Sequence, residues 1–271
     1  MGDVRGRWLG RHVNAAGWRV AGAARRSRAW TLAGAGLLGS MVVGQVLSGI
    51  RPAPIRLTSV VVVLLGSSAV AFLAGRDGGR RASAAFGAAV GAGYAAEWIG
   101  IRTGVPFGEY SYTSVLQPQL GGVPVIVAAA WGGMGLAAHA VATEIVPEGG
   151  PKRWVTGALA LTAWDLFLDP QMLRLGLWTW VEEGPYRGVP VSNFAGWLVV
   201  SLLVMGMIDM IVGRPEAAPP GGLLAIYGVM AGMETLAFAA VFEPPDRLVA
   251  VTGGIAMGTF AVLAWRRRWP R

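Results

Sequence analysis

Residues 191–213 read VSNFAGWLVVSLLVMGMIDMIVG, an apolar run interrupted by a single acid, Asp209. An α-helix rises about 1.5 Å per residue, so roughly 20 residues cross the hydrocarbon core of a bilayer, which is about 30 Å thick. This stretch is therefore predicted to cross a membrane as one helix.

Seven further apolar runs lie on both sides of this stretch. They cover residues 30–50, 57–75, 82–101, 123–146, 154–169, 221–242 and 248–265. The composition excludes an ordinary soluble domain, because 54% of the residues are hydrophobic, only 14% are charged and the mean hydropathy is +0.52. We expect an all-α, polytopic membrane bundle of about eight transmembrane helices. It forms one domain, residues 30–265, between an Arg-rich cytoplasmic tail at 1–29 and a basic cytoplasmic tail at 266–271.

The distribution of Lys and Arg predicts the orientation of these helices. If the runs alternate in direction, 17 of the 23 basic residues fall on the side of the two termini and 6 on the other side. Short loops rich in Lys and Arg stay in the cytoplasm, so both termini are expected to be cytoplasmic. The bias toward Ala, Gly, Arg and Trp favours a bacterial cell membrane. The net charge of +8 is assigned to this asymmetry, and no nucleic-acid partner is expected.

The residue inventory also limits the chemistry. The chain has no Cys and two His, which excludes a disulfide framework, thiolate metal sites and a Cys nucleophile. No nucleotide-binding motif is present, so neither a metal nor a cofactor is expected.

A short pattern recurs at an offset of 66 residues. Residues 122–125 read GVPV and are followed by Trp131, and residues 188–191 read GVPV and are followed by Trp197. The third and fourth helices and the fifth and sixth helices would then form a parallel internal repeat. Alternatively, both copies simply begin a helix in the same way, because Pro is tolerated in the first turn.

Four acids break the apolar character of the predicted spans. Glu97, Asp165, Asp169 and Glu234 lie at a similar depth, in the half of the bilayer away from the termini. Acids inside a membrane are costly and usually face a protein interior or a cavity. Asp165 and Asp169 are four residues apart and share a helix face. Two such carboxyls do not both ionise easily, so one should keep its proton and serve as a general acid.

A structural role for these acids is the alternative, with ion pairs to Arg102, Arg174 or Arg187 at the outer surface.

Pro170 is expected to end or kink the helix that carries Asp165 and Asp169.

Aromatic residues are dense in the same region. Trp and Tyr are common at any membrane interface, but this density exceeds what an interfacial belt needs. Aromatic faces stabilise cations and line sites for long apolar ligands. We therefore expect substrate contacts from Trp98, Phe107, Tyr110, Tyr112, Trp131, Trp164, Trp178, Trp180 and Trp197, together with Glu234. Protonated carboxyls beside electron-rich rings suit acid-initiated chemistry on an alkene.

Several sequence motifs follow one another in this region. They read EWIG at 97–100, TGVPFGEYSY at 103–112, WDLFLDPQM at 164–172, GPYRGVP at 184–190 and NFAGW at 193–197. The chain resembles, over residues 94–213, the integral-membrane carotenoid biosynthesis proteins that include γ-carotene 1',2'-hydratase and bisanhydrobacterioruberin hydratase. The resemblance implies a carotenoid with an acyclic end group as substrate, taken from the surrounding membrane lipids.

The resulting hypothesis is a hydratase that needs no cofactor. Asp169 protonates the terminal double bond, Asp165 raises the proton affinity of Asp169, and water captures the tertiary cation. Glu97 is the competing acid or the base that orients water. Asn193 either holds that water or caps a helix. Two alternatives stay open, a carotenoid end-group cyclase that uses the same protonation and a proton-coupled transporter with no enzymatic role.

Overall fold

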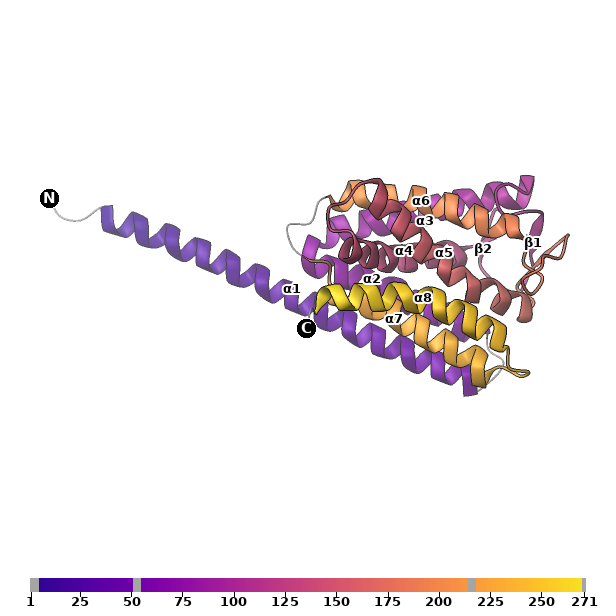
Figure 1. The fold of residues 1–271 in the computed structure, drawn as a ribbon. Coiled ribbons are helices and arrows are strands. Elements are labelled where there is room, and N and C mark those ends of the chain that lie inside the picture. Colours follow the sequence, from indigo (N-terminus) through magenta and orange to yellow (C-terminus); the bar gives the residue numbers. More distant parts are fainter. Residues whose placement is uncertain (1–4, 51–54, 214–217, 270–271) are drawn as a thin grey trace.

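The computed structural model describes residues 5–50, 55–213 and 218–269. Arg51, Arg214 and Arg271, which enter the charge asymmetry above, lie outside these residues, as do residues 1–4 of the Arg-rich tail. The described residues form the all-α bundle predicted from the sequence (Figure 1). Its helices are α1 (Arg5–Ile50), α2 (Ile55–Asp77), α3 (Gly79–Thr103), α4 (Val125–Ile145), α5 (Pro151–Arg174), α6 (Val191–Val212), α7 (Gly221–Leu236) and α8 (Arg247–Arg268).

Six of the helical segments in the described residues are long and apolar enough to cross a membrane, so the chain is an integral membrane protein. They belong to α1, α2, α4, α6, α7 and α8, and the α7 span runs on through the π-helical turn η1 (Ala237–Val241). The other two helices, α3 and α5, are also long, with 25 and 24 residues. They are the helices that carry Glu97, Asp165 and Asp169.

Two boundaries differ from the expected ones. Helix α1 begins at Arg5, within the region expected to be a tail, and projects beyond the bundle (Figure 1). Helix α5 continues through Pro170 to Arg174, so of the two expected effects of Pro170, an end or a kink of the helix, the end at this residue is wrong. Pro170 has no N–H for the carbonyl of Leu166, and this carbonyl instead accepts a hydrogen bond of 3.0 Å from the Tyr186 hydroxyl. A side chain from the connection after α5 thus supplies the donor that Pro170 lacks.

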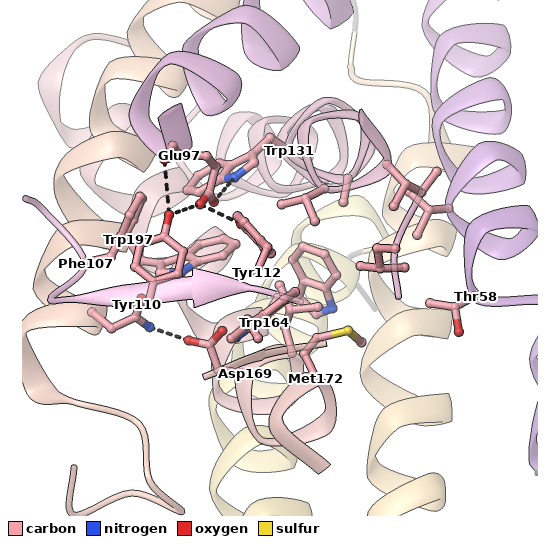
Figure 2. A pocket seen from close by; sticks show the side chains of 18 of the residues that line it. Thr58, Glu97, Phe107, Tyr110, Tyr112, Trp131, Trp164, Asp169, Met172 and Trp197 are labelled. Atoms are coloured by element: carbon pink, nitrogen blue, oxygen red, sulfur yellow. Dashed lines mark hydrogen bonds between the residues drawn. The ribbon is translucent and has the colours of Figure 1, made fainter. Parts of the chain in front are cut away.

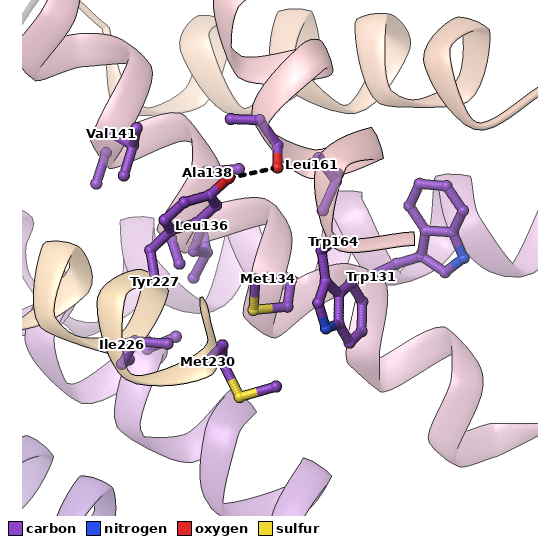
Figure 3. Close-up of a cluster of buried hydrophobic side chains, with 14 of the residues drawn as sticks. Trp131, Met134, Leu136, Ala138, Val141, Leu161, Trp164, Ile226, Tyr227 and Met230 are labelled. Carbon is purple, nitrogen blue, oxygen red and sulfur yellow. Dashed lines mark hydrogen bonds between the residues drawn. The ribbon is translucent and has the colours of Figure 1, made fainter. Parts of the chain in front are cut away.

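Helix α4 lies at the centre of the bundle, and most of its residues are buried. Small residues let neighbouring helices approach it, since a Cβ on Gly132 would lie 2.6 Å from the ring of Phe86. Figure 3 shows the apolar core around α4, where the Tyr227 hydroxyl donates a hydrogen bond of 2.8 Å to the carbonyl of Ala160. This bond satisfies a polar group that would otherwise be unpaired in an apolar core.

Two small sheets lie in the long connections at one end of the bundle, which we call the strand end (residues 104–124 and 175–190). Strand β1 (Tyr110–Tyr112) pairs antiparallel with β4 (Trp178–Trp180), and β2 (Gln119–Leu120) pairs with β3 (Val123–Pro124). The β1–β4 pair therefore links the connection after α3 to the connection after α5. The opposite end of the bundle carries the C-terminus (Figure 1).

The two segments that carry the recurring GVPV pattern pack in a similar way, and the internal repeat itself stays a prediction. Helices α4 and α6 both begin directly after the Pro of their GVPV sequences, and α3 and α5 each pack against both of them. The repeated Trp131 and Trp197 stack on each other, with ring centroids 4.0 Å apart and an interplanar angle of 17°. The two copies thus face each other across the middle of the bundle. The offset fails for one pair, because Trp98 is 42% exposed whereas Trp164 is 3% exposed.

Candidate active site

A cavity of about 60 Å³ lies between the two repeat copies at the strand end (Figure 2). Its wall is mostly aromatic and aliphatic, with three acidic or amide side chains, Glu97, Asp169 and Asn193. The aromatic members of the wall are Phe107, Tyr110, Tyr112, Trp131, Trp164, Trp178, Trp180 and Trp197.

Glu97 projects from α3 and is 5% exposed. Its Oε2 atom accepts hydrogen bonds from the Tyr110 hydroxyl and, at 2.7 Å, from the Tyr112 hydroxyl, and its Oε1 atom accepts one of 3.1 Å from the Trp131 indole N–H. Figure 2 shows these three side chains converging on Glu97. The alternation of side chains along β1 places both tyrosines on the same face of the strand. Three neutral donors therefore surround a buried acid.

Both tyrosines act as donors at neutral pH. Burial raises the pKa of Tyr110 and of Tyr112 above the ordinary value of a phenol, and the charge of nearby Glu97 raises both further. A neutral phenol keeps its hydrogen for Glu97 and lends no negative charge to the cavity.

Asp165 and Asp169 form the second polar group of the site. They are 0% and 2% exposed, and the Nδ2 group of Asn193 on α6 donates to both, at 2.8 Å to Asp165 Oδ2 and in a shorter contact to Asp169 Oδ2. The Oδ1 atom of Asp165 is buried without a hydrogen-bond partner among the described residues. The spacing that predicted a common helix face for the two acids is confirmed. Two buried carboxyls thus share one neutral donor.

Asn193 does not cap α6. The helix follows Pro190, and no side chain caps its first turn. The Asn193 amide instead reaches across to α5, so the helix-cap alternative is excluded by this geometry.

The expected aromatic residues meet around the two polar groups, with one exception. Trp164 packs edge-on against Trp197 at 6.1 Å, and Tyr112 packs edge-on against Trp178 at 5.5 Å. Trp98 does not line the cavity, because it faces outward with the Arg102 guanidinium 4.0 Å above its ring. The position of Trp98 next to Glu97 in the sequence indicated that it lies near the site, but its side chain projects from the outer face of α3.

Glu234 is also separate from this cavity. It is 8% exposed and lines a neighbouring cavity between α1, α2, α5 and α7. The structure therefore groups Glu97, Asp165 and Asp169 but not the fourth intramembrane acid.

The arginines considered as ion-pair partners bind elsewhere. Arg102 donates to the carbonyls of Trp98 and Gly121, Arg174 donates to the carbonyl of Pro244, and Arg187 pairs with Asp246 at 2.6 Å. Among the side chains that the structure describes, no Lys, Arg or His contacts Glu97, Asp165 or Asp169. Partners for these acids in the described part of the chain are thus neutral.

Further cavity-lining residues were not predicted from the sequence. Leu168 and Met172 follow Trp164 at intervals of four residues, which places all three on one face of α5. This spacing could have identified them. Thr58 and Val62 of α2 carry no comparable signal, because they belong to a run that is apolar throughout.

Comparisons with known proteins identify the family of the chain. Residues 58–261 match the family described as "Carotenoid biosynthesis protein". The chain is 31% identical over 134 residues to a protein named bisanhydrobacterioruberin hydratase from Haloarcula japonica, an alignment that covers 48% of this chain and 45% of that protein. The chain thus matches a little less than half the length of this curated relative. No solved structure matches the chain. Because the family match spans most of the chain, the protein belongs to the carotenoid biosynthesis protein family.

Proposed function

We propose that this protein is a carotenoid hydratase, which adds water to the terminal double bond of an acyclic carotenoid end group. The observation that carries the proposal is the pair Asp165 and Asp169, buried beside an aromatic cavity with one neutral donor, Asn193, between them. The matched relative is named a hydratase, which supports the same reaction class.

The acid in this mechanism is the aspartate pair. Two adjacent carboxylates without a cation repel one another, so the pair holds one proton in common. Asp169 lines the cavity whereas Asp165 lies behind it, and Asp169 therefore transfers the proton. The proton adds to the less substituted carbon of the terminal trisubstituted double bond, whose π electrons form the new C–H bond. The other alkene carbon becomes a tertiary cation.

The aromatic wall and the polar groups complete the reaction. Faces of Trp164 and Trp197 stabilise the cation, and a water oxygen attacks it to form the C–O bond. The bound water then loses one proton, which returns to the aspartate pair either directly or by way of Glu97, and this proton restores the acid. The net reaction adds one water molecule to one double bond, and it needs neither an oxidant nor a reductant.

Glu97 has a different role because its surroundings differ. Its three hydrogen-bond donors favour a carboxylate, which is an acceptor only. A carboxylate fixed at the edge of the cavity stabilises a nearby cation and orients the attacking water.

The test is expression in a bacterium that makes lycopene, followed by mass measurement of the extracted pigments. A hydratase adds the mass of one water for each end group that reacts. A cyclase would leave the mass unchanged and alter the absorption spectrum, and unchanged pigment would contradict both activities. Proton flux into vesicles in the absence of carotenoid would favour the transporter.

A further inference from the structure

A second, larger cavity of about 280 Å³ adjoins the candidate active site. Its lining comes from α1, α2, α5, α7 and η1. Five residues line both cavities: Thr58, Val62, Trp164, Leu168 and Met172. The two cavities therefore share a wall, and α5 supplies three of its five residues.

The sizes of the two cavities differ in a way that bears on a long substrate. The first cavity has a volume of about 60 Å³ and the second about 280 Å³, so the first is suited to an end group only. The remainder of a long polyene must lie elsewhere. The second cavity is more than four times larger and is lined mostly by aliphatic side chains and Met.

The second cavity reaches the apolar surface of the bundle between the end of α1 and η1. Four of its lining residues are exposed there, with Val46 45%, Ile50 70%, Leu236 53% and Val241 38% exposed. Exposed aliphatic side chains on a membrane-spanning helix face lipid. The second cavity therefore opens toward the bilayer, and this opening suits an apolar molecule.

The geometry of this opening depends on a glycine and a π-helical turn. A Cβ on Gly49 would lie 3.0 Å from Cγ1 of Val241, so α1 and η1 approach closely at this point. π-Helical turns are rare and frequently occur at functional sites. The chain after η1 is held in place, because the Arg174 guanidinium lies 5.3 Å from the Phe242 ring and donates to the carbonyl of Pro244 at 2.6 Å.

We propose that the second cavity holds the polyene chain of the substrate, which enters from the bilayer past Val46 and Ile50 of α1, beside the close contact between Gly49 and Val241. The chain passes Trp164, Leu168 and Met172, and its terminal double bond reaches the first cavity. The ligand class is a long, linear isoprenoid hydrocarbon. The inference rests on the proposed function, because that function defines the reacting end.

Two polar groups in this cavity define the competing interpretation. Glu234 forms no hydrogen bond with any side chain that the structure describes, and Gln45 has a buried amide oxygen without a partner among the described residues. Both could hold water on a path to Asp169. A water path and a polyene site make different predictions for variants that narrow the opening.

The experiment narrows the opening from either side. Gly49→Phe adds a ring where even a Cβ is in close contact, and Val241→Trp enlarges an exposed residue on the opposite rim. Gly39→Phe is the matched control, because Gly39 lies on the same helix and a Cβ added there would meet no atom within 4 Å. Each variant is produced in a lycopene-making bacterium and purified in detergent. The pigment retained per protein and the rate of hydration are then measured.

We expect both narrowed variants to retain about tenfold less pigment than wild type, while Gly39→Phe retains as much as wild type. Asp169→Asn should retain pigment without hydrating it, which separates binding from chemistry. If wild type retains pigment but forms no hydrated product, and the narrowed variants lose the pigment, the hydratase proposal fails and the binding site stands.

Two results would overturn the inference. One is wild-type pigment retention in both narrowed variants. The other is failure of wild type to retain any acyclic polyene. Loss of hydration in Glu234→Leu, combined with full pigment retention in the narrowed variants, would assign the second cavity to water instead. Melting temperatures of all variants show whether a lost pigment reflects a lost fold.

Discussion

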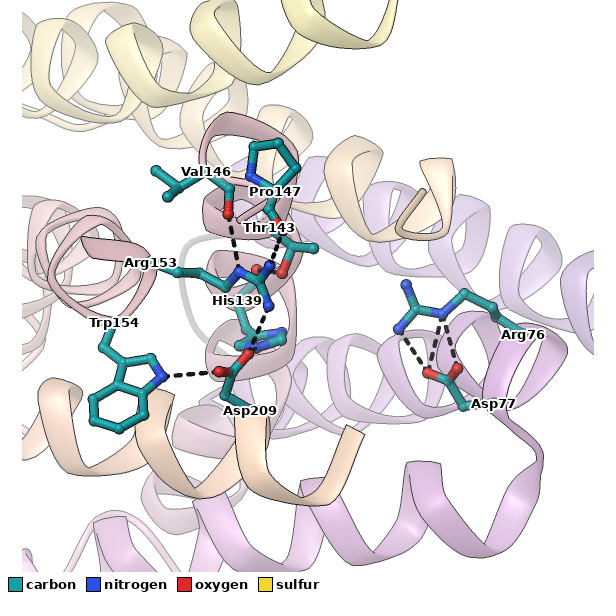
Figure 4. A network of polar contacts seen from close by, with 9 residues as sticks. All are labelled: Arg76, Asp77, His139, Thr143, Val146, Pro147, Arg153, Trp154 and Asp209. Carbon is teal, nitrogen blue, oxygen red and sulfur yellow. Dashed lines mark hydrogen bonds and ion pairs between the residues drawn. The ribbon is translucent and has the colours of Figure 1, made fainter. Parts of the chain in front are cut away.

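Buried or half-buried acids occur near both ends of the bundle, and their partners differ in kind. At the end opposite the strands, Asp209 Oδ1 accepts from Arg153 at 2.8 Å and from His139 at 3.1 Å, and its Oδ2 accepts from Trp154 at 3.0 Å (Figure 4). At the strand end, Glu97 and the aspartate pair accept only from Tyr, Trp and Asn side chains among the described residues. Asp209 therefore has a cationic partner, whereas the three acids of the candidate active site have none among the described residues.

This difference separates a structural acid from a chemical one. Arg153 is 1% exposed, donates to Asp209 and to the carbonyls of Val146 and Pro147, and lines neither of the two cavities described above. An acid with such a partner is held ionised and has no proton to give. The aspartate pair has only one neutral donor for two carboxyls among the described residues, so it is poorly stabilised as a dianion in an apolar setting, and Asp169 lies at a cavity that a ligand can fill.

The largest expected effect on activity is that of Asp169→Asn. An amide keeps the shape of the carboxyl but cannot donate a proton as an acid, so hydration should fall by at least about a hundredfold. The measurement is the initial rate of hydration in membranes, normalised to protein level. Asp165→Asn is the matched variant and should retain more activity, because Asp165 does not line the cavity. Full activity in the double variant would remove the pair from the mechanism.

Asp209→Asn should reverse this pattern and lower stability. It leaves the buried charge of Arg153 without its carboxylate, and breaking a buried ion pair costs about 3 to 5 kcal/mol. We expect less protein in the membrane and a lower melting temperature, with an unchanged rate per folded molecule. A normal melting temperature with lost activity would erase the distinction between the two ends.

The local features of this comparison could be predicted from the sequence, but the contacts between helices could not. Apolar runs identified the helices, and the i, i+4 spacing placed Asp165 beside Asp169, because both patterns are local. The pairing of Asp209 with Arg153, 56 residues away, was not predictable, since it depends on how α5 packs against α6. Asn193 shows the same limit, because its position near a helix start fits a cap equally well. Only packing shows that it joins two acids.

Tyr112→Phe tests the donors around Glu97. The change removes one hydrogen bond to a charged acceptor, an interaction that contributes about 1.5 to 3 kcal/mol, so the rate of hydration should fall by about tenfold or more. The fold should be kept, because the ring is retained and the edge-on contact with Trp178 remains. Glu97→Gln is the companion variant and should be at least as impaired. Wild-type rates in both would limit Glu97 to a packing role.

Trp164→Phe is expected to lower the rate by about tenfold, since a desolvated aromatic face stabilises a cation by roughly 1 to 2 kcal/mol. Trp164→Leu should lower it further because it removes the aromatic face. A packing role predicts a different result, with melting temperature falling together with activity. Trp178 lines the same cavity and provides the second pair of variants. Equal normalised rates for wild type, Phe and Leu at both positions would contradict cation stabilisation.

The smallest effect is expected at Asp246, an acid at the strand end that does have a cationic partner. It pairs with Arg187, and it caps α8 by accepting a hydrogen bond of 3.2 Å from the Val249 N–H. Burial alone would raise the pKa of Asp246, but the hydrogen bond and charge of Arg187, together with the Val249 N–H, lower it below its ordinary value of 3.8. The charged form of Asp246 therefore stabilises the fold above that ordinary value, and this contribution is lost as pH falls through the lower, folded value.

Asp246→Ala removes both the cap and the charge and should cost about 1 kcal/mol, whereas Asp246→Asn keeps a capping side chain and should cost less. Melting curves of wild type and Asp246→Asn are the measurement. Their difference should be constant between about pH 7 and 5 and should narrow only in stronger acid, because that is where wild-type Asp246 takes up its proton. Hydration per folded molecule should be unchanged in both variants. Loss of hydration in Asp246→Asn at neutral pH would show that a cationic partner does not mark an acid as structural, and the contrast with Asp169 would then lose its basis.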